Sequence, residues 1–228
     1  MSPTTRAVLF DVDFTLIYPG PTFQAEGYRQ FCARHGVTID PASFEAAVAK
    51  ASVVLERAQE GAYDPQVFID YTRSIIQDMG GRGPHVDAAA REIYDEWAGC
   101  QHFHLYDEVP DVLRRLREHG ILTGLISNTH RCLASFTSHF ELEGLISATV
   151  SSSLHGFMKP HRSIFDAALR LVGTEPAQAV MVGDSLKHDI EGALQIGMRA
   201  VLVARSGQPV VINSIPVIRN LTELFDHL

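Results

Sequence analysis

The stretch Ala7-Val-Leu-Phe-Asp-Val-Asp-Phe-Thr-Leu16 joins a short apolar run to two carboxylates that stand two residues apart. The run Ala7 to Phe10 has the β-branched and aromatic character of a strand that is buried on both faces. Because ligands bind at the carboxyl ends of the strands in open α/β sheets, Asp11 and Asp13 are a candidate catalytic pair. An isolated Asp-x-Asp is more often an ordinary polar turn. Residues further along the chain are needed to distinguish a catalytic pair from an ordinary turn.

The composition indicates a soluble globular protein and limits its partners. The chain has 228 residues, of which 46% are hydrophobic and 20% charged, enough for a core and a second small domain. A formal charge of -8 and the absence of a Lys/Arg block argue against a nucleic-acid partner and suit a divalent cation. No run approaches the roughly 18 apolar residues of a membrane helix, so we expect no membrane partner. Oligomeric state is left open.

The cysteines and the N-terminus favour a cytoplasmic protein. Cys32, Cys100 and Cys132 are widely spaced and form no Cys-x-x-Cys pattern, which argues against a disulfide framework and a zinc site. The chain enters its first strand almost at once, without the basic and apolar regions of a targeting segment.

The region after the first strand is predicted to be helical. Residues 17–21 hold two prolines and a glycine and indicate a linker. Asp40-Pro41 and Asp64-Pro65 are start signals in which the aspartate is the N-cap and the proline the first helical residue. The expected helices are 22–35, one from 40, 64–80 and 86–97. Four consecutive helices predict a separate domain over residues 19–104.

From about residue 110 the pattern alternates between helices and strands. Alternation of this kind implies a parallel sheet with helices on both faces, and the strand at 7–10 must join it because a lone strand cannot hide its edges. The expected strands are 121–126, 146–150, 179–182 and 200–203, and the expected helices are 110–120, 131–140, 163–172, 190–196 and one near 221. We therefore predict an α/β, Rossmann-like, doubly wound core over residues 1–18 and 105–228.

Three of these strands end in polar residues that suit metal-assisted phosphoryl transfer. The strand ends carry Asp11 and Asp13, then Ser127 and Asn128, then Asp184 with Asp189 five residues beyond it; Lys159-Pro160 lies in a loop between the last two strands. In a parallel sheet these ends share one edge. Carboxylate oxygens are the ligands that Mg²⁺ prefers, and Lys, Ser and Asn donors can balance charge on phosphoryl oxygens.

At this point the chain resembles the haloacid dehalogenase superfamily. Its four motifs are matched in order by Asp11-Val-Asp13-Phe-Thr15, Ser127-Asn128, Lys159-Pro160 and Gly183-Asp184-Ser-Leu-Lys-His-Asp189. Each motif alone is weak, but four in order are specific. The resemblance covers residues 5–18 and 105–205, and it implies that residues 19–104 are a helical cap domain of the first type.

The resemblance also implies a role for each matched residue. Asp11 is expected to attack phosphorus and form an aspartyl-phosphate, and Asp13 to exchange the proton. Ser127 and Lys159 are expected to bind the phosphoryl group, with Asn128 supporting the loop. Mg²⁺ would be held by Asp11, the Asp13 backbone carbonyl and Asp184, with Asp189 acting through water or behind the ligands. Thr15 would orient the first loop.

Phe14 departs from the family pattern, and Asp13 distinguishes between branches of the family. Phe14 stands where the commonest first motif has Gly, which puts substrate shape in doubt. The acidic Asp13 fits phosphatases and phosphomutases, whereas the resembling dehalogenases and phosphonate-cleaving enzymes have non-acidic residues there. A Schiff-base phosphonatase would need a cap lysine, and Lys50, the only lysine of residues 19–104, lies in mid-helix, where a solvated lysine is usual.

Several histidines invite a metal interpretation that their spacing does not favour. His102 and His104 are two apart in the expected hinge, where solvated or packing roles are commoner than zinc binding. His130 and His188 adjoin the second and fourth motifs, and contact with substrate is left open for both.

The sequence therefore predicts a Mg²⁺-dependent phosphohydrolase that acts on a small phosphorylated metabolite. Two alternatives stay open: a phosphomutase on a sugar phosphate, and a non-catalytic binding or regulatory protein on the same fold, since fold alone does not fix function.

Overall fold

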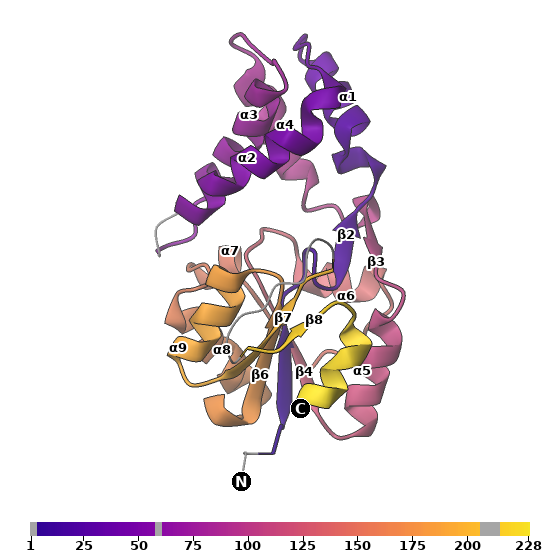
Figure 1. The fold of residues 1–228 in the computed structure, drawn as a ribbon, viewed down its shortest axis with the longest axis vertical. Helices are drawn as coiled ribbons and strands as arrows, with labels where there is room; N and C mark the ends of the chain where they lie inside the picture. The colour runs from indigo at the N-terminus through magenta and orange to yellow at the C-terminus, as the bar shows by residue number, and fades with distance from the viewer. Residues whose placement is uncertain (1–3, 58–60, 206–214) are drawn as a thin grey trace. The chain divides into compact units, whose positions relative to one another are not determined.

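A computed structural model describes residues 4–57, 61–205 and 215–228, which divide into two compact units (Figure 1). The core unit comprises the chain up to Tyr18, a short segment that ends at Tyr63, and the chain from Leu105 onward. The helical unit comprises most of the chain from Pro19 to His104. It is therefore an insertion between two parts of the core unit.

The core unit is built on a six-stranded sheet whose paired neighbours all run parallel, in the order β5-β4-β1-β6-β7-β8. Its strands are β1 (Ala7–Phe10), β4 (Leu122–Ser127), β5 (Ala148–Ser151), β6 (Ala179–Gly183), β7 (Arg199–Val203) and β8 (Val217–Ile218). Because β1 lies between β4 and β6 and is covered on both faces, every residue from Ala7 to Phe10 is fully buried.

Helices cover both faces of this sheet, which confirms the Rossmann-like α/β fold (Figure 1). Figure 1 shows α8 and α9 on one side of the strands, and α5 with the C-terminal helix on the other. The helices of the core unit are α5 (Val109–Glu118), α6 (Leu133–His139), α7 (Ser152–His155), α8 (Arg162–Val172) and α9 (Gly192–Gln195), with 3₁₀ helices at Pro176–Gln178 and Leu221–His227.

The apolar core on the α8 side joins strands that lie far apart in the sequence. Phe165 and Leu169 of α8 pack in one buried cluster with Leu9 of β1 and Met181 of β6. The α8 helix then ends at Gly173, whose φ of 67° is the left-handed conformation that favours glycine.

The register of the sheet determines which side chains meet at its carboxyl edge. Phe10 is the partner of Leu125 in β4 and of Val182 in β6. Asp11 directly follows Phe10. Ser127, at the end of β4, lies two residues beyond Leu125, and Asp184, just after β6, lies two residues beyond Val182. The three strand ends singled out in the sequence therefore share one edge, as expected for parallel strands.

The helical unit contains the four predicted helices. They are α1 (Ala25–Arg34), α2 (Phe44–Arg57), α3 (Pro65–Asp78) and α4 (Val86–Glu96), with 3₁₀ helices at Pro21–Phe23, Pro41–Ser43 and Cys100–His102. The Asp40 carboxylate accepts from the Ala42 N–H at 3.0 Å and the Asp64 carboxylate from the Gln66 N–H at 2.8 Å, so both Asp-Pro start signals are confirmed. In the parts of the chain that are described, no helix has the length and apolarity to cross a bilayer.

Four segments differ from the sequence-based expectation. Ile17–Pro19, predicted to be a linker, is the strand β2, which pairs with β3 (Phe103–Leu105) in a second sheet of two strands. The expected loop before Lys159 contains α7, β8 was not expected, and a π-helix, Leu186–Glu191, precedes α9. These elements are short or irregular, so hydrophobic periodicity gives little sign of them.

Replacing Phe165 by alanine is expected to destabilise the protein by about 3–5 kcal/mol, because a large, fully buried ring is lost from the core between α8 and the sheet. Leu171→Ala on the same helix is the matched control. Leu171 is 62% exposed, so its loss is expected to change stability by less than about 0.5 kcal/mol. Urea denaturation of the two variants measures both values, and similar losses would contradict this account of the core.

Candidate active site

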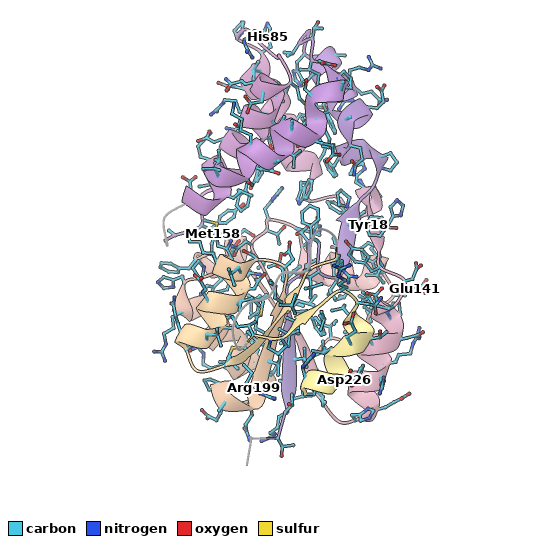
Figure 2. The ribbon with its side chains drawn as sticks, in the orientation of Figure 1. Tyr18, His85, Glu141, Met158, Arg199 and Asp226 are labelled. Carbon is cyan, nitrogen blue, oxygen red and sulfur yellow. The ribbon has the colours of Figure 1, made fainter. Side chains whose placement is uncertain are left out.

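Lys159 lies at the centre of the carboxyl edge of the sheet. Its ammonium Nζ donates to Asp11 Oδ1 at 2.6 Å and to Asp189 Oδ1 at 2.5 Å. Lys159, Asp11 and Asp189 are all buried, so the three charges interact with little screening by water. In Figure 2, Met158, which precedes Lys159, and Tyr18, which follows the first loop, mark this end of the core unit, with Arg199 and Asp226 at the other end.

Hydrogen bonds from three different loops fix this arrangement. Asn128 holds the backbone of Lys159 from both sides: its Oδ1 accepts from the Lys159 N–H at 2.7 Å, and its Nδ2 donates to the Lys159 carbonyl at 3.0 Å. The Thr15 hydroxyl donates to Asp11 Oδ2 at 3.2 Å, and the Ser185 N–H donates to Asp189 Oδ2 at 3.0 Å. Both carboxylates that contact Lys159 are therefore oriented by a second donor.

The cluster shifts the pKa values of its members. Burial, opposed by Lys159 and reinforced by the charge of Asp189, raises the pKa of Asp11 to about 7. Burial alone would lower the pKa of Lys159, but Asp11 and Asp189 outweigh it and raise that pKa above its usual range. Desolvation, together with the charges of Asp11 and Asp189, raises the pKa of Asp184 above its usual range.

Asp11, Asp184 and Asp189 form a group of oxygen ligands that fits a hard divalent cation. One carboxylate oxygen from each lies within 4.8 Å of the others. A donor set made only of carboxylates suits Mg²⁺ better than zinc. Asp189 is the most deeply buried of the three, whereas Asp184 is exposed, so Asp11 and Asp184 are the members that a hydrated cation can reach more easily. The expected place of Asp189 behind the ligands stays a prediction.

The hydroxyl of Ser127 is buried and donates no hydrogen bond within the described residues. Ser127 ends β4 beside Asp11, and its Oγ has no hydrogen-bond partner among the described residues. A buried hydroxyl without a partner costs free energy, and the hydroxyls of Thr123, Ser151 and Thr174 share this state with that of Ser127. An anionic oxygen bound at this edge would satisfy it.

Asp13 faces a different cation from Asp11. The Nη1 atom of Arg131 donates to both carboxylate oxygens of Asp13, at 3.0 and 3.1 Å. The sequence expectation did not include Arg131. The only sequence feature that could have pointed to Arg131 is its position four residues after Ser127. That spacing does not predict that the Arg131 side chain contacts Asp13, in the loop after β1.

Phe14, the departure from the family's usual glycine, adopts the backbone that a glycine would favour. Its φ is 63°, in the left-handed region that non-glycine residues rarely occupy, and its side chain is 45% exposed. The Phe14 N–H donates to the Ile17 carbonyl at 2.7 Å, so the strained residue sits in a tight turn directly after Asp13.

Three residues that the sequence did not favour as ligands or catalytic groups, His102, Lys50 and His188, contact other side chains. His102 contacts Glu96 at 2.8 Å, and Lys50 donates to Asp78 at 2.6 Å. His188 contacts the Ser185 hydroxyl at 3.0 Å. Within the described residues, no histidine joins a group able to hold a metal.

The structure is an α/β protein in which Lys159, Asp11 and Asp189 meet at the carboxyl edge of a parallel sheet. Comparison with known proteins identifies its family. Residues 5–197 match the haloacid dehalogenase-like hydrolase family model, and the chain belongs to that family. The resemblance drawn from the four motifs is confirmed at this level.

Three relatives show the range of similarity. A glyceraldehyde 3-phosphate phosphatase of Methanopyrus kandleri is 32% identical over 88% of this chain and 84% of its own. The human haloacid dehalogenase-like hydrolase domain-containing protein 3 is 26% identical over 92% of this chain and 87% of its own. The magnesium-bound structure of the HAD-hydrolase YfnB from Bacillus subtilis has a TM-score of 0.76 at 19% identity and covers 98% of each chain, which shows the shared fold.

Asp11→Asn is expected to stabilise the metal-free protein at alkaline pH. The carboxyl group titrates near 3.8 when unfolded and near 7 when folded, so its contribution to stability is full below the unfolded pKa and lost as the pH rises through the folded pKa. Asparagine cannot ionise and escapes this loss. With a chelator present, the variant should melt above wild type at about pH 8, with a smaller difference at about pH 5. A variant that melts below wild type at the higher pH would contradict the prediction.

Lys159→Met is expected to cost about 3–5 kcal/mol of stability near neutral pH, because it leaves two buried carboxylates without their cation. Lys50→Met is the matched control. The Lys50 side chain is 72% exposed in its pair with Asp78, and its loss should cost less than about 1 kcal/mol. Urea denaturation measures both variants, and equal costs would contradict a buried role for Lys159.

Proposed function

We propose that this protein is a Mg²⁺-dependent phosphohydrolase that cleaves a small phosphorylated metabolite through an aspartyl-phosphate at Asp11. The observation that carries the proposal is the Lys159 ammonium held between Asp11 and Asp189, beside the unpartnered Ser127 hydroxyl. A cation and a free buried donor next to a carboxylate are the groups that a transferring phosphoryl group requires.

In the first half-reaction, an oxygen of Asp11 attacks phosphorus while the bond from phosphorus to the leaving oxygen breaks. Thr15 and Lys159 each donate to one oxygen of Asp11 and so fix its direction. Ser127 and Lys159 donate to the phosphoryl oxygens as their charge is redistributed. Asn128 acts through the backbone of Lys159, which it holds in place.

Asp13 carries the proton in both half-reactions. It protonates the leaving oxygen in the first, and in the second it takes a proton from the water that attacks the aspartyl-phosphate. The carboxylate of Asp11 is then restored and phosphate is released. A divalent cation held by Asp11, the Asp13 backbone carbonyl and Asp184 would offset the negative charge that otherwise separates carboxylate from phosphate.

The relatives and the inserted helical unit support a small substrate. The Methanopyrus kandleri relative is a glyceraldehyde 3-phosphate phosphatase, which makes a three-carbon phosphate ester a first candidate. Residues 19–104 are proposed to act as a cap that encloses the substrate and excludes water. A cytoplasmic location is proposed with this function, since small phosphorylated metabolites are found there.

The test is phosphate release from a panel of small esters, including glyceraldehyde 3-phosphate, phosphoserine and p-nitrophenyl phosphate, with Mg²⁺ and then with chelator. Wild type should release phosphate only with the metal, and Asp11→Asn should release none, a loss of more than about a thousandfold. Asp111→Asn is the control, because Asp111 lies on the exposed surface of α5 and should keep full activity.

Two results would contradict the proposal. Phosphate release that persists in Asp11→Asn would remove the nucleophile. Conversion of a sugar phosphate into its isomer, with little free phosphate, would indicate a phosphomutase instead.

A further inference from the structure

Arg131 is the largest fully buried side chain of the described residues, and it lies beside the proposed active site. It lies in the loop between β4, which ends at Ser127, and α6; the same loop carries Asn128. Its guanidinium group contacts Asp13, whose side chain is 18% exposed, whereas the Arg131 side chain has no exposed surface. A buried guanidinium group needs a compensating partner, so the position of Arg131 and that of Asp13 are linked.

The loop that contains Arg131 is hydrogen-bonded to the segment after β5. The Arg131 N–H donates to the Thr129 hydroxyl at 3.0 Å. The Thr129 carbonyl in turn accepts from the Ser153 N–H at 3.3 Å and from the Ser152 hydroxyl at 3.4 Å. Arg131 therefore reaches Asp13 from a backbone that is held independently of the first loop.

The contact with Asp13 restricts how its carboxylate can turn. A single nitrogen, Nη1, lies 3.0 and 3.1 Å from the two oxygens, so rotation of the carboxylate would lengthen at least one of these hydrogen bonds. Asp13 follows Asp11 by two residues but does not share its cation, because Lys159 contacts Asp11 and Asp189. Each carboxylate of the first loop thus has its own positively charged partner.

We propose that Arg131 is a positioning residue that orients the Asp13 carboxylate for proton exchange with the leaving oxygen and the attacking water. The inference rests on the proposed function, since it assigns a supporting residue to the same site. In this proposal Arg131 acts on the rate through the Asp13 carboxylate and not by binding the substrate. Its effect on rate should therefore depend on how much the reaction needs a proton from Asp13.

The dependence on the leaving group separates positioning from general support of the fold. An alkoxide leaving group needs protonation in the first half-reaction, whereas p-nitrophenolate leaves without it. Because kcat/KM reports the steps up to the first irreversible one, it isolates this half-reaction. Damage to the fold or to phosphate binding would lower kcat/KM for both esters alike.

The experiment measures kcat/KM with Mg²⁺ for p-nitrophenyl phosphate and for the alkyl ester that wild type hydrolyses fastest. Arg131→Met is expected to lose about tenfold to a hundredfold on the alkyl ester and less than about threefold on p-nitrophenyl phosphate. Arg131→Lys keeps a buried charge and should recover part of the loss. Arg114→Met, at an exposed position on α5, is the control and should match wild type on both esters.

A double-mutant cycle supplies the second readout. In the background of Asp13→Asn, Arg131→Met should lower the rate on the alkyl ester by less than about twofold, because the residue through which it acts is already impaired. Melting temperatures of all variants show whether they are folded.

Several results would overturn the proposal. Equal losses on the two esters, or a full additional loss in the Asp13→Asn background, would show that Arg131 does not act through Asp13. Failure of both Arg131→Met and Arg131→Lys to fold would show a purely structural role. In these cases an active wild type leaves the proposed function standing, whereas a wild type that hydrolyses no ester removes the proposed function and this inference together.

Discussion

The ion pairs of Lys159 with Asp11 and Asp189 are the interaction on which the candidate site depends. Residues that lie far apart in the sequence meet at this ammonium group, and each is buried. Desolvation raises the pKa of Asp11 and of Asp184, and the charges of the neighbouring carboxylates raise both further, although Lys159 opposes the shift. The remaining negative charge is what makes the edge receptive to a divalent cation.

The parallel sheet supplies the geometry that this charge cluster needs. With Phe10 paired to Leu125 and Val182, the chain changes from apolar to polar directly after Phe10 on β1 and one residue later on β4 and β6. A slip of one residue in any pairing would move a functional side chain to the other face of the sheet. The fully buried β1 resists such a slip, because its apolar residues pack on both faces.

Sequence patterns predicted the parts of the molecule that are periodic or local. The apolar strands, the Asp-Pro helix starts and the order of the four motifs are all local signals, and they were sufficient for the fold and family. Arg131 was missed because its partner, Asp13, lies 118 residues away, and no local pattern encodes that contact. The pairing of Ala62 with Phe157, a single antiparallel bridge between distant loops, was missed for the same reason.

Phe14 shows how the surroundings can enforce a backbone that its own residue disfavours. A left-handed non-glycine residue costs of order 1–3 kcal/mol and persists only where neighbouring contacts over-determine it. Here the Leu16 N–H donates to the Val12 carbonyl at 2.8 Å, and Arg205 donates to the Thr15 carbonyl at 2.6 Å.

Arg205 is itself fixed by a 2.7 Å ion pair with Glu108 and by its position 3.4 Å above the Tyr106 ring. The turn between Asp13 and Ile17 is therefore held by residues outside the four motifs. This explains how the first loop keeps its shape with phenylalanine where the family commonly has glycine, and it leaves an exposed aromatic ring beside the carboxylate proposed to exchange protons with the substrate.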